Sequence, residues 1–148
     1  MTIQETIAAS RKIVIKFGSN SLAKADGTIN VDFLNLIAQE CAALIAQGKQ
    51  VIIVSSGAQL AGSSAIDGWA HKKDQHYRQA LAAIGQVELM DKWRSAFKKQ
   101  ALHVAQLLFV KEDFAACGLV KPNYHIERSC FSGAVIALYH KALSNGYG

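Results

Sequence analysis

Short apolar runs alternate with segments of helical periodicity along the first part of the chain. Residues 12–17 (KIVIKF) and 50–55 (QVIIVS) are rich in β-branched side chains and predict two buried strands. Between them, Asn30 suits a helix N-cap, Gly48 suits the position just after a helix, and apolar residues recur at helical spacing. This order of strand, helix and strand with short connections predicts a right-handed βαβ unit and a parallel sheet.

A second amphipathic segment follows the second strand. Residues 76–99 predict a helix packed on the sheet, and residues 102–110 predict a third strand. The apolar stripe of this helix consists of Leu81, Ile84, Leu89, Met90, Trp93 and Phe97. From Ala116 onward the periodicity weakens, and residues 133–143 fit one short helix. The predicted fold class is therefore α/β.

Composition and charge limit the class of protein. The chain has 148 residues, of which 51% are hydrophobic and 18% charged, and this excludes a disordered chain and favours one domain. The net charge is +5, but the cations are scattered, so we expect no nucleic-acid partner. No apolar run approaches the ~18 residues of a membrane span, and the N-terminal segment lacks a signal-peptide pattern. We therefore expect no membrane association and a cytoplasmic location.

The cysteines indicate neither a disulfide framework nor a metal centre. The three cysteines lie far apart, and their odd number argues against paired disulfides. They form no CxxC pair and no Cys/His spacing that is typical of a zinc site. The sequence therefore predicts no metal ligands.

Two strand ends carry the residues best suited to binding an anion. Lys16, Gly18 and Ser19 follow the first strand, and Ser56 and Gly57 follow the second. In an open parallel sheet, ligands bind at the carboxyl ends of the strands, where glycines let backbone N–H groups approach and a lysine adds a compact positive charge. Neither stretch matches the GxxxxGK[ST] or the GxGxxG pattern. The residues alone leave an anion-binding site and tight structural turns as alternatives.

Four blocks resemble the amino acid kinase family, and its glutamate 5-kinase branch in particular. In order and spacing they are RKIVIKFGSNSL, VIIVSSGAQLAG, ALAAIGQVELMDKWRSAF and VAQLLFVKEDF, and they cover about residues 11–115. The strand ends are shared across the family, whereas the LAAIGQ..LM..W...F block is more specific to this branch. Carbamate and acetylglutamate kinases stay as alternatives within the family, and a non-catalytic fragment that binds an anion or a partner stays as one outside it.

The resemblance implies ATP-dependent phosphorylation of the γ-carboxylate of L-glutamate, with Mg²⁺, as the first step of proline synthesis. Lys16 resembles the family lysine that contacts the transferring phosphoryl group. Gly18 and Ser19 resemble residues whose backbone approaches the phosphates of ATP. Ser56 matches a glutamate-binding serine, and Gly57 lies beside it. The resemblance also makes a homo-oligomer an expectation.

Two parts of the sequence depart from the family pattern. Gln59 stands where the family has an apolar residue, and a polar side chain there is expected to affect the helix start or the substrate pocket. Residues 116–148 contain neither the NENDxV block nor a GTGGM-like loop. We therefore divide the chain into a kinase part, 1–115, and an unrelated or frameshifted tail, 116–148. The expected fold is a partial three-layer α/β/α sandwich with a mostly parallel sheet and a missing C-terminal half, and we expect little or no activity from the chain alone.

Overall fold

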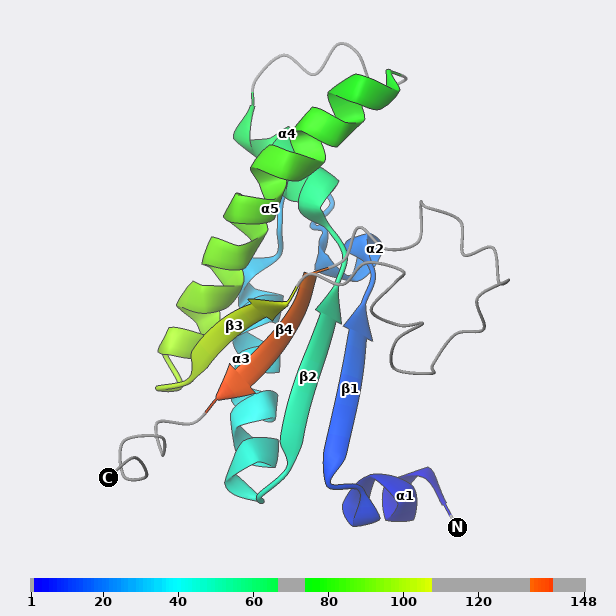
Figure 1. Cartoon of the computed structure of the whole chain (residues 1–148), viewed down its shortest axis with the longest axis vertical. Helices are drawn as coiled ribbons and strands as arrows, with labels where there is room; N and C mark the ends of the chain where they lie inside the picture. Colours follow the sequence, from blue (N-terminus) through cyan, green and yellow to red (C-terminus); the bar gives the residue numbers. More distant parts are fainter. Residues whose placement is uncertain (1, 67–73, 108–133, 140–148) are drawn as a thin grey trace.

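The computed structural model describes residues 2–66, 74–107 and 134–139. They form a four-stranded sheet with helices packed against one of its faces, which confirms the α/β class (Figure 1). The elements in chain order are α1 (Ile3–Ala9), β1 (Lys12–Phe17), α2 (Ser19–Leu22), α3 (Val31–Ala46), β2 (Gln50–Ser55), α4 (Ala58–Ala65), α5 (Gln75–Lys98), β3 (His103–Leu107) and β4 (Ala134–Tyr139). Both strands of the predicted βαβ unit have the bounds that the sequence predicted.

The sheet has the strand order β1-β2-β4-β3. β1 and β2 are parallel, and β4 is antiparallel to both of its neighbours, β2 and β3. β3 therefore runs in the same direction as β1 and β2, so three strands point one way and β4 points the other (Figure 1). Three of the four strands share one direction, as expected for a mostly parallel sheet. Of the three strand pairs, β1 with β2 is parallel, and the two pairs that involve β4 are antiparallel.

The prediction of a helix over residues 133–143 was wrong for residues 134–139, and the other residues of that range lie outside the described part of the chain. Residues 134–139 form β4, which fills the position between β2 and β3 and hydrogen-bonds to both. A six-residue apolar run has too few turns to distinguish a buried strand from a buried helix by periodicity. The open ladders of two neighbouring strands supply backbone partners that an isolated helical turn could not.

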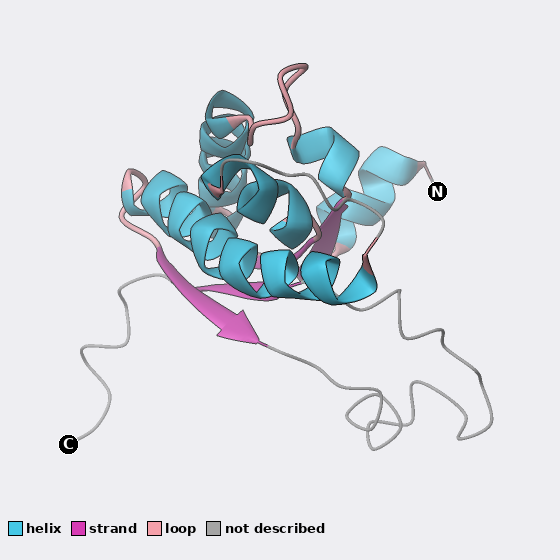
Figure 2. Ribbon diagram, turned by 90° about the horizontal axis from the view of Figure 1, so that it is seen from above, coloured by secondary structure: helices cyan, strands magenta, loops and turns pink. Residues whose placement is uncertain are grey.

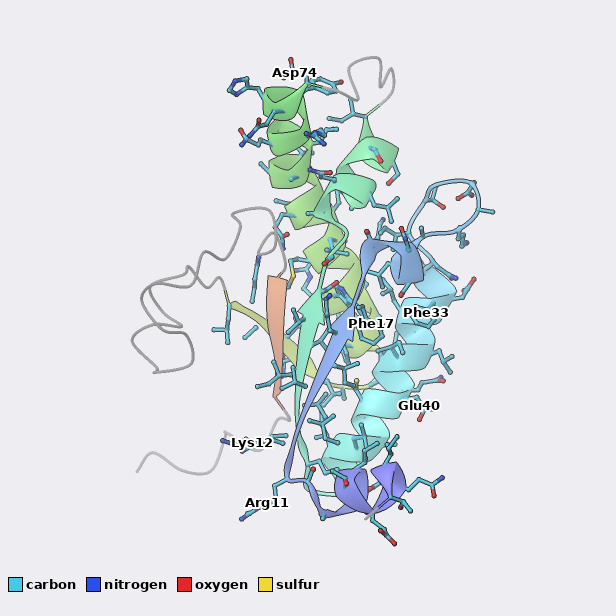
Figure 3. The ribbon with its side chains drawn as sticks, turned by 90° about the vertical axis from the view of Figure 1, so that its right-hand side faces the viewer. Arg11, Lys12, Phe17, Phe33, Glu40 and Asp74 are labelled. Carbon is cyan, nitrogen blue, oxygen red and sulfur yellow. The ribbon has the colours of Figure 1, made fainter. Side chains whose placement is uncertain are left out.

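The described helices lie on one face of the sheet (Figure 2). In β1, the Phe17 side chain points toward α3, whereas Lys12 points away from the helices (Figure 3). Lys12, Val14 and Lys16 alternate with the inward residues and are exposed. The face that they share carries no helix among the described residues, which form two layers, one of strands and one of helices.

An aromatic cluster lies at the centre of the core between the sheet and the helices. The Trp93 ring lies 5.8 Å from the Phe17 ring and 5.7 Å from the Phe97 ring, and Phe17 meets Phe33 edge-to-face at 5.9 Å. The predicted stripe on α5 is buried at Leu81, Leu89, Trp93 and Phe97. The prediction was wrong at Ile84, which is 45% exposed, because the neighbouring glycine occupies the buried position of that turn.

Helix α3 begins and ends where the sequence predicted. The Asn30 side chain accepts a hydrogen bond from the backbone N–H of Phe33 at 3.1 Å. Gly48 follows the helix with a φ of +78°, the left-handed conformation that glycine adopts without a steric penalty. The helix therefore sets the length of the connection between the two parallel strands.

Helix α1 was not predicted, although the sequence contains a signal for it. Thr2 and Glu5 form a capping box, in which each side chain accepts a hydrogen bond from the other residue's backbone N–H. The Lys49 ammonium donates to the carbonyl groups of Ile7, Ala8 and Ser10 at 2.9–3.0 Å. These contacts attach α1 to the amino-terminal end of the sheet, opposite the end where β1 and β2 finish (Figure 1).

We predict that the Cys41 thiol reacts only after unfolding. Burial is the main cause that raises the pKa of Cys41 from 9.0 to about 11, with Glu40 as a smaller cause. Because the thiolate is the nucleophile, the folded chain at pH 9 should label far more slowly than the chain in guanidinium chloride. The measurement uses the double variant Cys117→Ser/Cys130→Ser and a chromogenic disulfide reagent.

The raised pKa of Cys41 also makes the free energy of unfolding depend on pH. Since the folded pKa lies above the unfolded one, the stabilisation tied to this proton is present below about pH 9 and is lost as the pH rises through about 11. Equal labelling rates for folded and denatured chains would show that Cys41 is not protected.

Candidate active site

The two predicted strand ends lie side by side at one edge of the sheet. β1 and β2 are paired in parallel, with Lys16 opposite Val54. One step further along, the backbone N–H of Ser56 donates to the carbonyl oxygen of Phe17 at 2.9 Å. The structure therefore brings the segment Lys16–Ser19 next to the segment Ser56–Gly57, as a βαβ unit requires.

The first of these segments presents one charged side chain and a helix start. Lys16 is exposed on the sheet face that carries no described helix. Gly18 precedes α2 in an extended conformation and makes no side-chain cap, and Ser19 is the exposed first residue of that four-residue helix. An ammonium group and the N–H groups of a helix start therefore lie at the same strand end.

The second segment depends on the backbone of Gly57. Its φ is +114° and its ψ is 6°, a left-handed conformation that turns the chain from β2 directly into α4. A Cβ atom at this position would lie 3.3 Å from the Leu22 side chain, so the turn is also closely packed. Any other residue at position 57 would be strained by its backbone conformation.

Ser56 cannot offer all the groups that the sequence analysis assigned to this end. Its backbone N–H donates to the Phe17 carbonyl, so this N–H group is not free to bind a ligand. Its side chain is half-buried, and within the described part of the chain its hydroxyl makes no hydrogen bond. The donors left on this side are that hydroxyl and the N–H groups of the first turn of α4, where the helix dipole favours an anion.

Gln59 does not interrupt the helix start. α4 begins at Ala58, and Gln59 is an exposed residue of its first turn. Its side chain lines a surface cavity of about 460 Å³ together with Asp26, Gly27, Thr28, Leu60, Ser63 and Ser64. The Asp26 carboxylate accepts hydrogen bonds from the N–H and hydroxyl of Thr28 at 2.9 and 2.6 Å, and these bonds hold its pKa below the usual value.

Sequence reasoning missed a buried polar pair beneath the two strand ends. The Trp93 indole nitrogen donates to the Ser55 hydroxyl at 3.0 Å, and both side chains are completely buried. The two residues lie 38 positions apart. The sequence signal was a serine in an otherwise apolar strand, which requires a partner in the core.

A close contact between two helices sets the position of α4. Gly62 of α4 and Gly85 of α5 face each other, and a methyl group at position 85 would overlap the carbonyl oxygen of Ala58 and the backbone nitrogen of Gly62. Only glycine allows the two backbones to approach this closely. Because Ala58 is the first residue of α4, this contact also fixes the turn at Gly57.

The described residues contain neither a membrane span nor a metal cluster. None of the helices described is both long enough and apolar enough to cross a bilayer. In the same part of the chain, no three His, Cys, Asp or Glu side chains come together as metal ligands.

An α/β domain with a lysine and glycine-based turns at adjacent parallel strand ends fits a class of phosphate-handling domains. The profile of the amino acid kinase family matches residues 11–146, and the chain belongs to this family. The match continues into residues 116–146, part of the segment that we separated as a tail. The boundary at residue 115 stays a prediction.

Similar proteins point to one branch of the family. The chain is 50% identical over 112 residues to a glutamate 5-kinase of Alkaliphilus oremlandii, a match that covers 76% of this chain and 43% of that protein. It is 49% identical over 113 residues to a glutamate 5-kinase of Alkaliphilus metalliredigens, and 45% identical over 129 residues to one of Treponema pallidum. The matches cover 43% and 44% of those two proteins, so the chain spans less than half the length of these curated relatives.

We predict that Gly85→Ala displaces α4 and destabilises the domain. The added methyl group has no space against the Ala58 carbonyl, and overpacking of this kind costs about 1–3 kcal/mol. Denaturant unfolding of the 148-residue chain measures the change. Val87→Ala is the matched control on the same helix, because Val87 is 71% exposed and should change stability by less than about 0.5 kcal/mol. A Gly85→Ala chain as stable as the unmodified one would contradict the contact.

Proposed function

We propose that this chain carries the phosphoryl-contacting and glutamate-contacting part of a glutamate 5-kinase. The observation that carries the proposal is the juxtaposition of Lys16–Gly18 and Ser56–Gly57, through the hydrogen bond between Ser56 and Phe17, in a member of the amino acid kinase family. The similarity to glutamate 5-kinases supports L-glutamate as the acceptor of the phosphoryl group. The second candidate, an anion-binding module without catalysis, rests on the same strand ends.

In this proposal each residue has a separate task. The Ser56 hydroxyl and the first turn of α4 bind a carboxylate of L-glutamate, and Lys16 neutralises charge on the transferring phosphoryl group. Gly18 and Ser19 bring backbone N–H groups close to the phosphates of the nucleotide. When bound, ATP with Mg²⁺ supplies the phosphoryl group. Phosphoryl transfer needs mainly positioning and charge neutralisation from the protein, which these groups can provide.

Location and assembly belong to the same proposal. A kinase of amino-acid synthesis that uses ATP works in the cytoplasm, where both substrates are present. The homo-oligomer expected from the family stays a prediction, and sedimentation velocity over a range of chain concentrations would test it.

We predict that the chain binds L-glutamate weakly and that Lys16 contributes to this binding. Because the strand ends are partly open to solvent, the dissociation constant should be about 1 mM, or about −4 kcal/mol. Lys16→Ala should weaken binding about fivefold, since an exposed charge pair contributes about 1 kcal/mol. Titration followed by NMR measures the constants, with Lys12→Ala as the matched control from the same strand and the same exposed face.

Three outcomes would count against the assignment. Lys12→Ala and Lys16→Ala could weaken binding equally, which would indicate only a general effect of positive charge. L-glutamine, which lacks the γ-carboxylate, could bind as tightly as L-glutamate. Equal binding of inorganic phosphate and L-glutamate without any further selectivity would favour the anion-binding module.

Turnover is predicted separately from binding. Residues 1–148 contain no NENDxV block and no GTGGM-like loop, so we expect no glutamate-dependent ADP release above background. Poor positioning of one reactant forfeits much of the ~7–11 kcal/mol that proximity supplies. A coupled ADP assay checks this. A glutamate-dependent rate that Lys16→Ala abolishes would prove the chain active and overturn the prediction.

A further inference from the structure

One side chain of α5 contacts both strand ends of the candidate site. The Trp93 ring packs on Phe17, which directly precedes Gly18, with 5.8 Å between the ring centres. The indole nitrogen of the same residue donates to Ser55, which directly precedes Ser56, at 3.0 Å. Trp93 therefore lies beneath the junction of β1 and β2, and Phe97 stacks on its ring at 5.7 Å.

The hydrogen bond continues from Trp93 to the backbone of the site. The Ser55 hydroxyl accepts from the indole and donates to the carbonyl oxygen of Ser56 at 3.1 Å. The N–H of Ser56 donates to the Phe17 carbonyl at 2.9 Å. The N–H and the carbonyl group of Ser56 are thus held by Phe17 and Ser55, and Trp93 contacts both of these residues.

Packing alone does not require this pair. A phenylalanine or leucine would fill much of the same volume without a polar atom. A buried indole N–H needs an acceptor, and Ser55 is the one polar residue that is completely buried in the part of the chain described here. Removing the Ser55 hydroxyl leaves the indole N–H unpaired in the core, at a cost of about 1–3 kcal/mol. Removing the indole leaves the Ser55 hydroxyl with only its hydrogen bond to the Ser56 carbonyl.

We propose that Trp93 is a positioning residue that fixes the two strand ends relative to each other through Phe17 and Ser55. The inference rests on the proposed function, because the position that matters is that of Ser56 beside Lys16. Trp93 does not touch a reactant. It acts through the peptide groups of Ser56, and its loss should weaken L-glutamate binding by misplacing the Ser56 hydroxyl.

Amide hydrogen exchange tests the positioning without any ligand. In Trp93→Phe and in Ser55→Ala, exchange of the Ser56 amide should become about tenfold faster, because its hydrogen bond to Phe17 opens more often. The Gln50 amide donates to Arg11 at 2.8 Å at the other end of the same strand pair, and its exchange should not change. Ser63→Ala is the matched serine control, since that hydroxyl donates within its own helix, to the carbonyl oxygen of Leu60.

Two exchange results would overturn the proposal. Equal acceleration at Ser56 and Gln50 would indicate a general loss of stability, and no acceleration at either would indicate a pair without positioning effect. Two variants are used because Trp93→Phe keeps an aromatic ring in the core and Ser55→Ala leaves Trp93 itself unchanged. If one of them fails to fold, the other still decides.

L-glutamate titration then separates the positioning proposal from the proposed function. Each single variant should raise the dissociation constant about fivefold, and the double variant should raise it no further, because both act through one hydrogen bond. Variants that bind L-glutamate as the unmodified chain does would overturn the positioning role while leaving the function intact. If the unmodified chain binds no L-glutamate, the proposed function fails, and the exchange experiment decides the role of Trp93.

Discussion

The parallel pairing of β1 with β2 is the constraint on which the candidate site depends. Parallel strands finish at the same edge of a sheet, so a shift of the register would move Ser56 away from Phe17. The connection that allows this pairing is α3, whose ends are fixed by Asn30 and Gly48. The site therefore follows from the chain geometry of a βαβ unit before any side chain is considered.

Local signals were sufficient for the elements that form this unit. KIVIKF and QVIIVS are short runs rich in β-branched residues, and Asn30 and Gly48 each act within one helical turn. Strand propensity and helix capping depend on residues that are close in the sequence, so both can be predicted from a short stretch of it. The prediction of a buried strand at residues 12–17 was wrong, because β1 alternates between an exposed face with Lys16 and an inward face with Phe17. The two lysines of the run are the signal for this alternation.

The parts that could not be predicted depend on distant residues or on competing local preferences. Residues 134–139 became a strand because β2 and β3 offer open ladders, and the run itself does not reveal this. The pair of Ser55 with Trp93 joins a strand to a helix 38 residues later, and no periodicity connects them. α1 was the avoidable omission, since its capping box of Thr2 and Glu5 is visible in the sequence.

Helix α5 supports the site without belonging to it. Leu81, Gly85, Leu89, Trp93 and Phe97 recur every four residues and are all buried. Gly85 lets α4 approach and so sets the turn at Gly57, while Trp93, about 12 Å further along the helix axis, holds the ends of β1 and β2. In the proposed site the strand ends supply the binding groups, and α5, which contacts Phe17, Ser55 and α4, fixes the positions of those groups.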